Sequence, residues 1–178
     1  MDHIKVTPSE LQKSIRNVPD FPMAGIQFKD ITPVLADARL FAGSIDLLID
    51  SFRPGTIDAV VGIDARGFIF AAAAALKLKA GFIPVRKKGK LPYNTFEQSY
   101  ELEYGSSTIA IHTDAVGPGS RVLLIDDLLA TGGTAAAAAQ LVTQTGAEIV
   151  EISFLIELSF LKGREKLAKY PVRSLVVY

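Results

Sequence analysis

Two adjacent carboxylates, Asp126 and Asp127, precede a short loop of small residues at positions 130–134, and this spacing suits a phosphorylated sugar. The loop reads Ala-Thr-Gly-Gly-Thr, and its glycines can adopt positive φ, so that successive backbone N–H groups converge on an anion. The carboxylates suit sugar hydroxyls or a hydrated Mg²⁺, which prefers hard oxygen ligands. These residue types therefore predict a site for a phosphate monoester beside a polyol and a metal ion.

A strand and a helix must position these groups. The aliphatic run at 122–125 predicts a strand buried on both faces that ends at the two carboxylates, and the alanine run at 135–139 predicts the start of a helix. Open α/β sheets bind ligands at the carboxyl ends of their strands, and the helix N-terminus adds positive potential. Other phosphate-binding motifs, Gly-Lys-Ser/Thr and Gly-x-Gly-x-x-Gly after a strand, do not occur.

A second strand-to-helix junction carries Arg66, between a predicted strand at 58–63 and a predicted helix at 68–78. Arginine there can pair with a carboxylate or bind phosphate oxygens bidentately. A third strand at 81–85 leads into Arg86, Lys87, Lys88 and Lys90, which form either a solvated loop or a second phosphate-facing group.

Composition bounds the remaining possibilities. A chain of 178 residues with 49% hydrophobic residues predicts one compact domain. Nineteen basic and nineteen acidic residues cancel, so net charge favours neither nucleic acid nor a membrane as a partner. The absence of cysteine excludes disulfides and thiolate metal sites. No leader and no apolar run of about 18 residues is present, so we expect a cytoplasmic protein.

Residues 123–134 resemble the phosphoribosyl pyrophosphate signature of the type I phosphoribosyltransferases, and the form Asp-Asp-Leu-Leu-Ala-Thr-Gly-Gly-Thr is most similar to members that act on adenine. The resemblance continues in order at 25–31, 86–92, 100–105 and 161–167. It implies an α/β fold with a central, mostly parallel sheet flanked by helices. It also implies one domain over 1–178, with a hood at 1–34 and a core at 35–178 that carries a flexible β-arm at about 87–107.

The resemblance assigns the reaction and the sugar site. Phosphoribose passes from 5-phosphoribosyl 1-pyrophosphate to adenine, with Mg²⁺ held mainly by substrate and at most partly by the carboxylates. The residues expected to bind phosphoribose are Asp126, Asp127, Ala130, Thr131, Gly132, Gly133 and Thr134. Those expected to bind pyrophosphate are Arg66, Arg86, Lys87 and Lys90. A homodimer is also implied.

The resemblance further places the base. The residues expected to contact it are Gln27, Phe28, Lys29 and Tyr104, with Phe28 stacking on the purine. Lys29 replaces the arginine of the family pattern and lacks its planar fork. Glu103 is expected at the purine imidazole edge, and Glu103 and Arg66 are the expected catalytic residues. A solvent-facing strand position is the alternative for Glu103.

Periodicity predicts the remaining elements. An amphipathic helix within 1–20 places Leu11, Ile15 and Val18 on one side, and a helix at 40–52 has Asp37 as its N-cap. Two strands joined by a turn at 105–107 are expected at 100–105 and 108–112. The C-terminal part is expected to form a strand, a short charged helix and a closing strand at 148–156, 162–167 and 174–177.

Three other functions share parts of this pattern. A phosphoribosyltransferase for hypoxanthine, guanine, xanthine or orotate shares the central motif. A non-catalytic sensor of phosphoribosyl pyrophosphate would need a basic DNA-binding domain, for which the first thirty residues are too short and too mixed in charge. A receiver-like protein has an acidic pair at a strand end but no use for the Thr-Gly-Gly-Thr loop.

Overall fold

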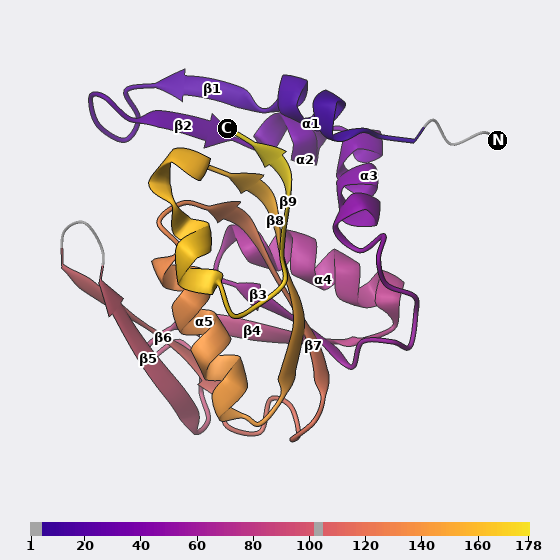
Figure 1. Ribbon diagram of the computed structural model, residues 1–178, viewed down its shortest axis with the longest axis vertical. Helices are drawn as coiled ribbons and strands as arrows, with labels where there is room; N and C mark the ends of the chain where they lie inside the picture. Colours follow the sequence, from indigo (N-terminus) through magenta and orange to yellow (C-terminus); the bar gives the residue numbers. More distant parts are fainter. Residues whose placement is uncertain (1–4, 102–104) are drawn as a thin grey trace. The chain divides into compact units, whose positions relative to one another are not determined.

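The computed structural model describes residues 5–101 and 105–178, and the chain divides into two compact units, Met1–Leu48 and Ile49–Tyr178 (Figure 1). The elements of the first unit are α1 (Pro8–Ser14), β1 (Arg16–Pro19), β2 (Gln27–Asp30), α2 (Thr32–Ala36) and α3 (Ala38–Leu48). Strands β1 and β2 form an antiparallel hairpin in which Val18 is opposite Phe28.

The first helix is shorter than periodicity predicted. A capping box between Thr7 and Glu10 begins α1, and the helix ends at Ser14 instead of near Pro19. Val18 precedes a proline, which disfavours the helical conformation, and it lies in β1 instead of on the apolar side of the helix. The prediction for Val18 was therefore wrong, whereas Leu11 and Ile15 are buried as expected.

The predicted N-cap at Asp37 is confirmed. Its Oδ1 accepts a hydrogen bond of 2.9 Å from the backbone N–H of Leu40, in the first turn of α3. The helix ends at Leu48, one turn before the predicted end at Phe52.

The second unit is built on a seven-stranded sheet in the order β5-β6-β4-β3-β7-β8-β9. Its strands are β3 (Ala59–Ile63), β4 (Gly81–Lys87), β5 (Thr95–Glu101), β6 (Ser106–His112), β7 (Arg121–Leu129), β8 (Glu148–Glu157) and β9 (Val172–Val177). Its helices are α4 (Arg66–Leu78), α5 (Gly133–Gln144) and the 3₁₀ helices η1 (Ser159–Leu161) and η2 (Gly163–Leu167). Strands β4, β3, β7, β8 and β9 are parallel and β5 and β6 antiparallel, which confirms the mostly parallel sheet.

The two long helices of this unit cover opposite faces of the sheet (Figure 1). Val61 and Leu124 belong to the core beneath α5. A Cβ on Gly62 would lie 2.7 Å from the Cβ of Ala71 in α4, so β3 and α4 pack closely on the other face. Side chains of successive strand residues point to opposite faces, and burial on both sides explains the continuous aliphatic runs of β3 and β7.

In the β-arm, β5 and β6 form an antiparallel pair, and both strands begin earlier in the sequence than predicted. Strand β5 begins at Thr95 instead of residue 100, and Ser106 and Ser107 belong to β6 instead of to a turn. Tyr100 is opposite Ser107 in the antiparallel register. Glu97 and Ser99 are exposed, whereas Gln98 lies on the half-buried face with Phe96 and Tyr100, so a polar residue on the inner face hid the alternation.

Candidate active site

The carboxylate pair lies within strand β7 and not at its end. Asp126 is opposite Phe154 of β8, and the pairing continues to Leu129 opposite Glu157. The predicted end of the strand at the carboxylates was therefore wrong by two to three residues. The strand continues through Leu128 and Leu129, because the hydrophobic residues of the sequence do not stop at the acidic pair.

Asp126 depends on a glycine in α4 for its position. A Cβ on Gly67 would lie 2.5 Å from Oδ1 of Asp126, so only glycine allows the carboxylate to lie against the first turn of this helix. The same Oδ1 accepts a hydrogen bond of 2.9 Å from the backbone N–H of Asp127. Burial raises the pKa of the Asp126 carboxyl well above its usual range, and the charge of Asp127 raises it further.

Asp127 is paired with the arginine that begins α4. The Nε of Arg66 lies 2.8 Å from Oδ2 of Asp127, and the exposed fractions of the two side chains are 39% and 7%. Burial raises the pKa of Asp127, and the guanidinium opposes that shift. Burial therefore favours the protonated form of both carboxyl groups, and the guanidinium of Arg66 favours the charged form of Asp127.

The loop between β7 and α5 presents backbone donors at a helix N-terminus. Gly132 has φ 77° and precedes the first residue of α5, and no side chain caps this end of the helix. The first N–H groups of an α-helix have no intrahelical acceptor, so they are available to an anion. The free N–H groups at the start of α5 therefore lie at the loop for which the two glycines predicted a phosphate site.

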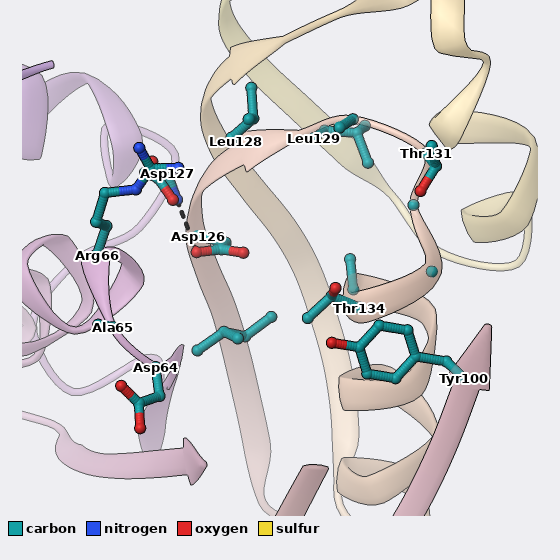
Figure 2. A pocket seen from close by; sticks show the side chains of 15 residues that line it. Asp64, Ala65, Arg66, Tyr100, Asp126, Asp127, Leu128, Leu129, Thr131 and Thr134 are labelled. Carbon is teal, nitrogen blue, oxygen red and sulfur yellow. Dashed lines mark hydrogen bonds and ion pairs between the residues drawn. The ribbon is translucent and has the colours of Figure 1, made fainter. Parts of the chain in front are cut away.

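These groups surround one cavity of about 390 Å³ in the second unit (Figure 2). Figure 2 shows Arg66 and Asp127 on one side, with Thr134 and Tyr100 on the other. The predicted residues that line the cavity are Arg66, Asp126, Asp127, Ala130, Thr131, Gly132, Gly133 and Thr134. The structure therefore brings together the predicted phosphoribose residues and one of the four cations predicted to bind pyrophosphate.

The peptide between Asp64 and Ala65, which both line the cavity, is cis. The sequence left the isomer of this bond open. Asp64 also forms an ion pair with Arg86, one of the four cations predicted to bind pyrophosphate. The Nε of Arg86 lies 3.1 Å from Oδ2 of Asp64.

The other predicted pyrophosphate residues do not line the cavity. Arg86 also donates a hydrogen bond of 3.0 Å to the carbonyl oxygen of Lys90, so its guanidinium closes the loop that follows β4. Lys87, at the end of β4, and Lys90 are exposed. Lys88 makes an ion pair of 2.7 Å with Glu97 of β5.

The predicted base-contacting residues lie elsewhere in the chain. Gln27, Phe28 and Lys29 form part of β2 in the first unit, and the ring of Phe28 makes an edge contact with Phe21 at a centroid distance of 5.1 Å. The Nζ of Lys29 donates a hydrogen bond of 2.5 Å to Oδ1 of Asn17, and burial lowers its pKa. Glu103 and Tyr104 lie outside the described residues.

Tyr100 lines the cavity and was not predicted as a site residue. A Cβ on Gly133 would lie 3.3 Å from Cδ2 of Tyr100, so the aromatic ring packs against the start of α5. Phe96 and Tyr100 pack against the same core and are four residues apart on β5. Residues two and four positions apart on a strand point to the same face. Because Phe96 is four positions before Tyr100, comparing the two aromatic residues would have predicted that the ring of Tyr100 lies on the face towards the core.

Within residues 5–101 and 105–178, no group of three His, Cys, Asp or Glu side chains is arranged to hold a metal ion. The side-chain oxygen atoms that line the cavity belong to three carboxylates and three hydroxyl groups, those of Asp64, Asp126, Asp127, Tyr100, Thr131 and Thr134. That donor set fits Mg²⁺, which is commonly bound through one or two carboxylates together with substrate oxygens and water. Among the described helices, none is both long and apolar enough to cross a bilayer.

Comparison with known proteins first defines the class. Residues 27–176 match the model of the phosphoribosyl transferase domain family. The chain is 55% identical over 170 residues to an adenine phosphoribosyltransferase of Roseiflexus sp. (strain RS-1), covering 96% of this chain and 99% of that protein.

Solved structures agree with this match. The crystal structure of adenine phosphoribosyltransferase from Rhodothermus marinus has a TM-score of 0.90 and 52% identity, covering 96% of this chain and 98% of that one. The corresponding values for the Saccharomyces cerevisiae protein are 0.90, 44%, 95% and 98%. The chain therefore belongs to the adenine phosphoribosyltransferase family.

Proposed function

We propose that the protein transfers 5-phosphoribose from 5-phosphoribosyl 1-pyrophosphate to adenine, which yields AMP and pyrophosphate. The observation that carries this function is the convergence of Asp126, Asp127 and the loop at 130–134 on one cavity. The similar Saccharomyces cerevisiae protein was crystallised with adenine and an imino-altritol 1,6-bisphosphate.

The sugar phosphate fits the cavity from the loop to the carboxylates. The loop residues Ala130, Thr131, Gly132, Gly133 and Thr134 bind the 5′-phosphate through backbone N–H groups and the threonine hydroxyls. Asp126 and Asp127 accept hydrogen bonds from the ribose hydroxyls. Burial raises the pKa of Asp126, and hydrogen bonds donated by the ribose hydroxyls to its carboxylate oppose that shift.

Pyrophosphate binds on the Arg66 side of the cavity, with Lys87 as its second cation and with Arg86 and Lys90 beside it. The guanidinium of Arg66 already faces Asp127 and is 39% exposed, so it can reach a phosphate oxygen without leaving the site. Lys87 and Lys90 are exposed at the end of β4, where phosphate oxygens can replace water around their ammonium groups.

The base is bound by the hood, at residues 1–34, and by the arm, at about 87–107. Phe28 stacks on adenine, with Gln27 and Lys29 beside it on β2 and with Tyr104 from the arm. Glu103 handles the proton at the imidazole edge of the purine. Lysine at position 29 keeps a positive charge near the base but provides no bidentate contact.

Catalysis relies on positioning and electrostatics. Positive charge develops on the ribose as pyrophosphate departs, and ionised Asp126 and Asp127 stabilise that charge. Arg66 and Lys87 stabilise the negative charge of the leaving group. Asp126 and Asp127 are the residues that would contact Mg²⁺, and the bound ion supplies further positive charge beside pyrophosphate. Closure of the arm over the site excludes water, which would otherwise hydrolyse the sugar donor.

The whole chain forms a single phosphoribosyltransferase domain, and the protein is a cytoplasmic homodimer. This part of the proposal rests on the family resemblance and on the relatives, which the chain matches over nearly their full length. Sedimentation at several protein concentrations tests the dimer directly, since a monomer at micromolar concentration would contradict it.

The experiment that tests the function is release of pyrophosphate from the sugar donor, measured separately with adenine, hypoxanthine, guanine, xanthine and orotate. Turnover with adenine alone, and its loss when Mg²⁺ is chelated, is the expected result. Turnover with an oxopurine instead would retain the sugar site and overturn the choice of base. Tight binding of the donor without turnover would overturn the enzymatic function.

A further inference from the structure

The backbone of Gly163, at the start of η2, lies directly against the loop between β7 and α5. A Cβ on Gly163 would lie 2.2 Å from the carbonyl oxygen of Ala130 and 2.8 Å from the nitrogen of Gly132. A Cβ on Gly132 would in turn lie 2.3 Å from the carbonyl oxygen of Gly163. Real Cβ atoms do not occupy such distances, so the two backbones are in contact with no side chain between them.

The two glycines are required for different reasons. Gly132 has positive φ, which favours glycine whatever its neighbours. Gly163 does not have positive φ, so only the close contact with the loop requires glycine there. A substitution at Gly163 therefore reports on that contact and not on backbone conformation.

The residue after Gly163 anchors η2 to two strands. Arg164 makes bidentate contacts of 3.1 and 2.5 Å with the carboxylate of Glu157, at the end of β8, whose side chain is buried. It also donates hydrogen bonds to the carbonyl oxygen of Val172, at 2.7 Å, and to Oγ of Ser174, at 3.3 Å, both in β9. Such bidentate pairs add geometric precision as well as energy.

We propose that Gly163 is a positioning residue for the 5′-phosphate loop and that Arg164 holds it in place. The loop consists of small residues, whose conformation is fixed only by what they contact. Contact with the anchored 3₁₀ helix η2 restricts the conformation of the loop. The backbone N–H groups of the loop are therefore oriented for the phosphate before substrate binds. The inference rests on the proposed function, because it assumes that the loop binds the 5′-phosphate.

The test compares Gly163→Ala with Gly117→Ala. Gly117 also lacks positive φ, and its added Cβ would meet only Oγ of Ser120, at 3.9 Å, so it is a matched control. Calorimetry measures the Kd of AMP, which carries the 5′-phosphate, and of pyrophosphate, which does not. We expect Gly163→Ala to weaken AMP binding about tenfold or more, since small displacements in a binding site are costly, and to leave pyrophosphate binding unchanged.

Two results would overturn the proposal. Equal AMP affinity in the two variants would show that the contact does not position the loop. Equal losses for AMP and pyrophosphate in Gly163→Ala would show general damage to the fold. Turnover of the unsubstituted enzyme with adenine, measured in the same buffer, tests the proposed function separately.

A second pair of variants covers the case in which Gly163→Ala does not fold. Arg164→Gln removes the anchor, and Arg173→Gln removes a comparable arginine of β9 that pairs with Asp50 and Ser51. We expect selective loss of AMP affinity in Arg164→Gln, a rise in KM for the sugar donor with little change in kcat, and neither effect in Arg173→Gln. Identical behaviour of the two arginine variants would contradict the positioning role.

Discussion

Replacement of Arg66 by glutamine leaves the carboxylate of Asp127 without its opposite charge. The two side chains are 2.8 Å apart, and Asp127 is 7% exposed. Removing one partner of a fully buried ion pair costs about 3–5 kcal/mol. Because water reaches Arg66 and screens part of this interaction, we expect the free energy of unfolding to fall by about 2 kcal/mol. In a chain of this size that loss corresponds to a decrease in Tm of about 4–8 °C.

The effect has a defined pH dependence. Burial raises the pKa of Asp127 and Arg66 lowers it, so loss of the guanidinium raises it further. A carboxyl whose pKa is higher in the folded than in the unfolded protein loses stability as pH rises. The deficit of Arg66→Gln is therefore largest at about pH 8 and shrinks towards about pH 5, where protonation removes the unpaired charge.

Thermal unfolding of Arg66→Gln, Asp127→Asn and the double variant completes the cycle. We expect Asp127→Asn to restore most of the Tm lost in Arg66→Gln but not its activity, because both side chains contact substrate in the proposed site. Arg39→Gln is the control, since its ion pair with Glu10 is exposed to solvent and its loss should leave Tm nearly unchanged. A Tm of Arg66→Gln equal to that of the unsubstituted protein at alkaline pH would refute the reasoning, as would failure of the second substitution to restore it.

Three further substitutions test single groups in the cavity. Asp126→Asn removes a carboxyl whose pKa is raised by burial, so its Tm relative to the unsubstituted protein should increase as pH rises from about 4 to 8, and a constant difference would contradict this. Thr131→Ala removes at most one charge-assisted hydrogen bond, about 1.5–3 kcal/mol, so kcat/KM should fall by about 10- to 150-fold, and a larger loss with intact folding would indicate another role. Tyr100→Phe should leave Tm unchanged and raise KM for the sugar donor about three- to tenfold; an unchanged KM would exclude its hydroxyl from substrate binding.

The grouping of these residues around one cavity was predictable because the loop at 130–134 and the carboxylates are close together in the sequence. The glycines of the loop permit the positive φ that its turn requires, and helix α5 follows immediately. The parallel strands were predictable as well, since burial on both faces produces uninterrupted aliphatic runs. Errors arose where competing local signals met, as at Val18, where a residue on the apolar side of a predicted helix precedes proline.

What could not be predicted is how distant residues adjust the contiguous ones. The pKa of Asp126 depends on its burial and on the charges of Asp127 and Arg66. Its contact in α4, Gly67, lies about sixty residues earlier in the sequence. Gly67 and Gly163 have no side chain, so their residue type alone does not indicate a role in the site. A motif therefore indicates which ligand a loop can bind. The ionisation of the neighbouring carboxylates and the rigidity of the loop depend on backbone packing, which only the folded chain displays. For this reason we expect substitutions at these supporting glycines to alter affinity and pH dependence while leaving the reaction itself unchanged.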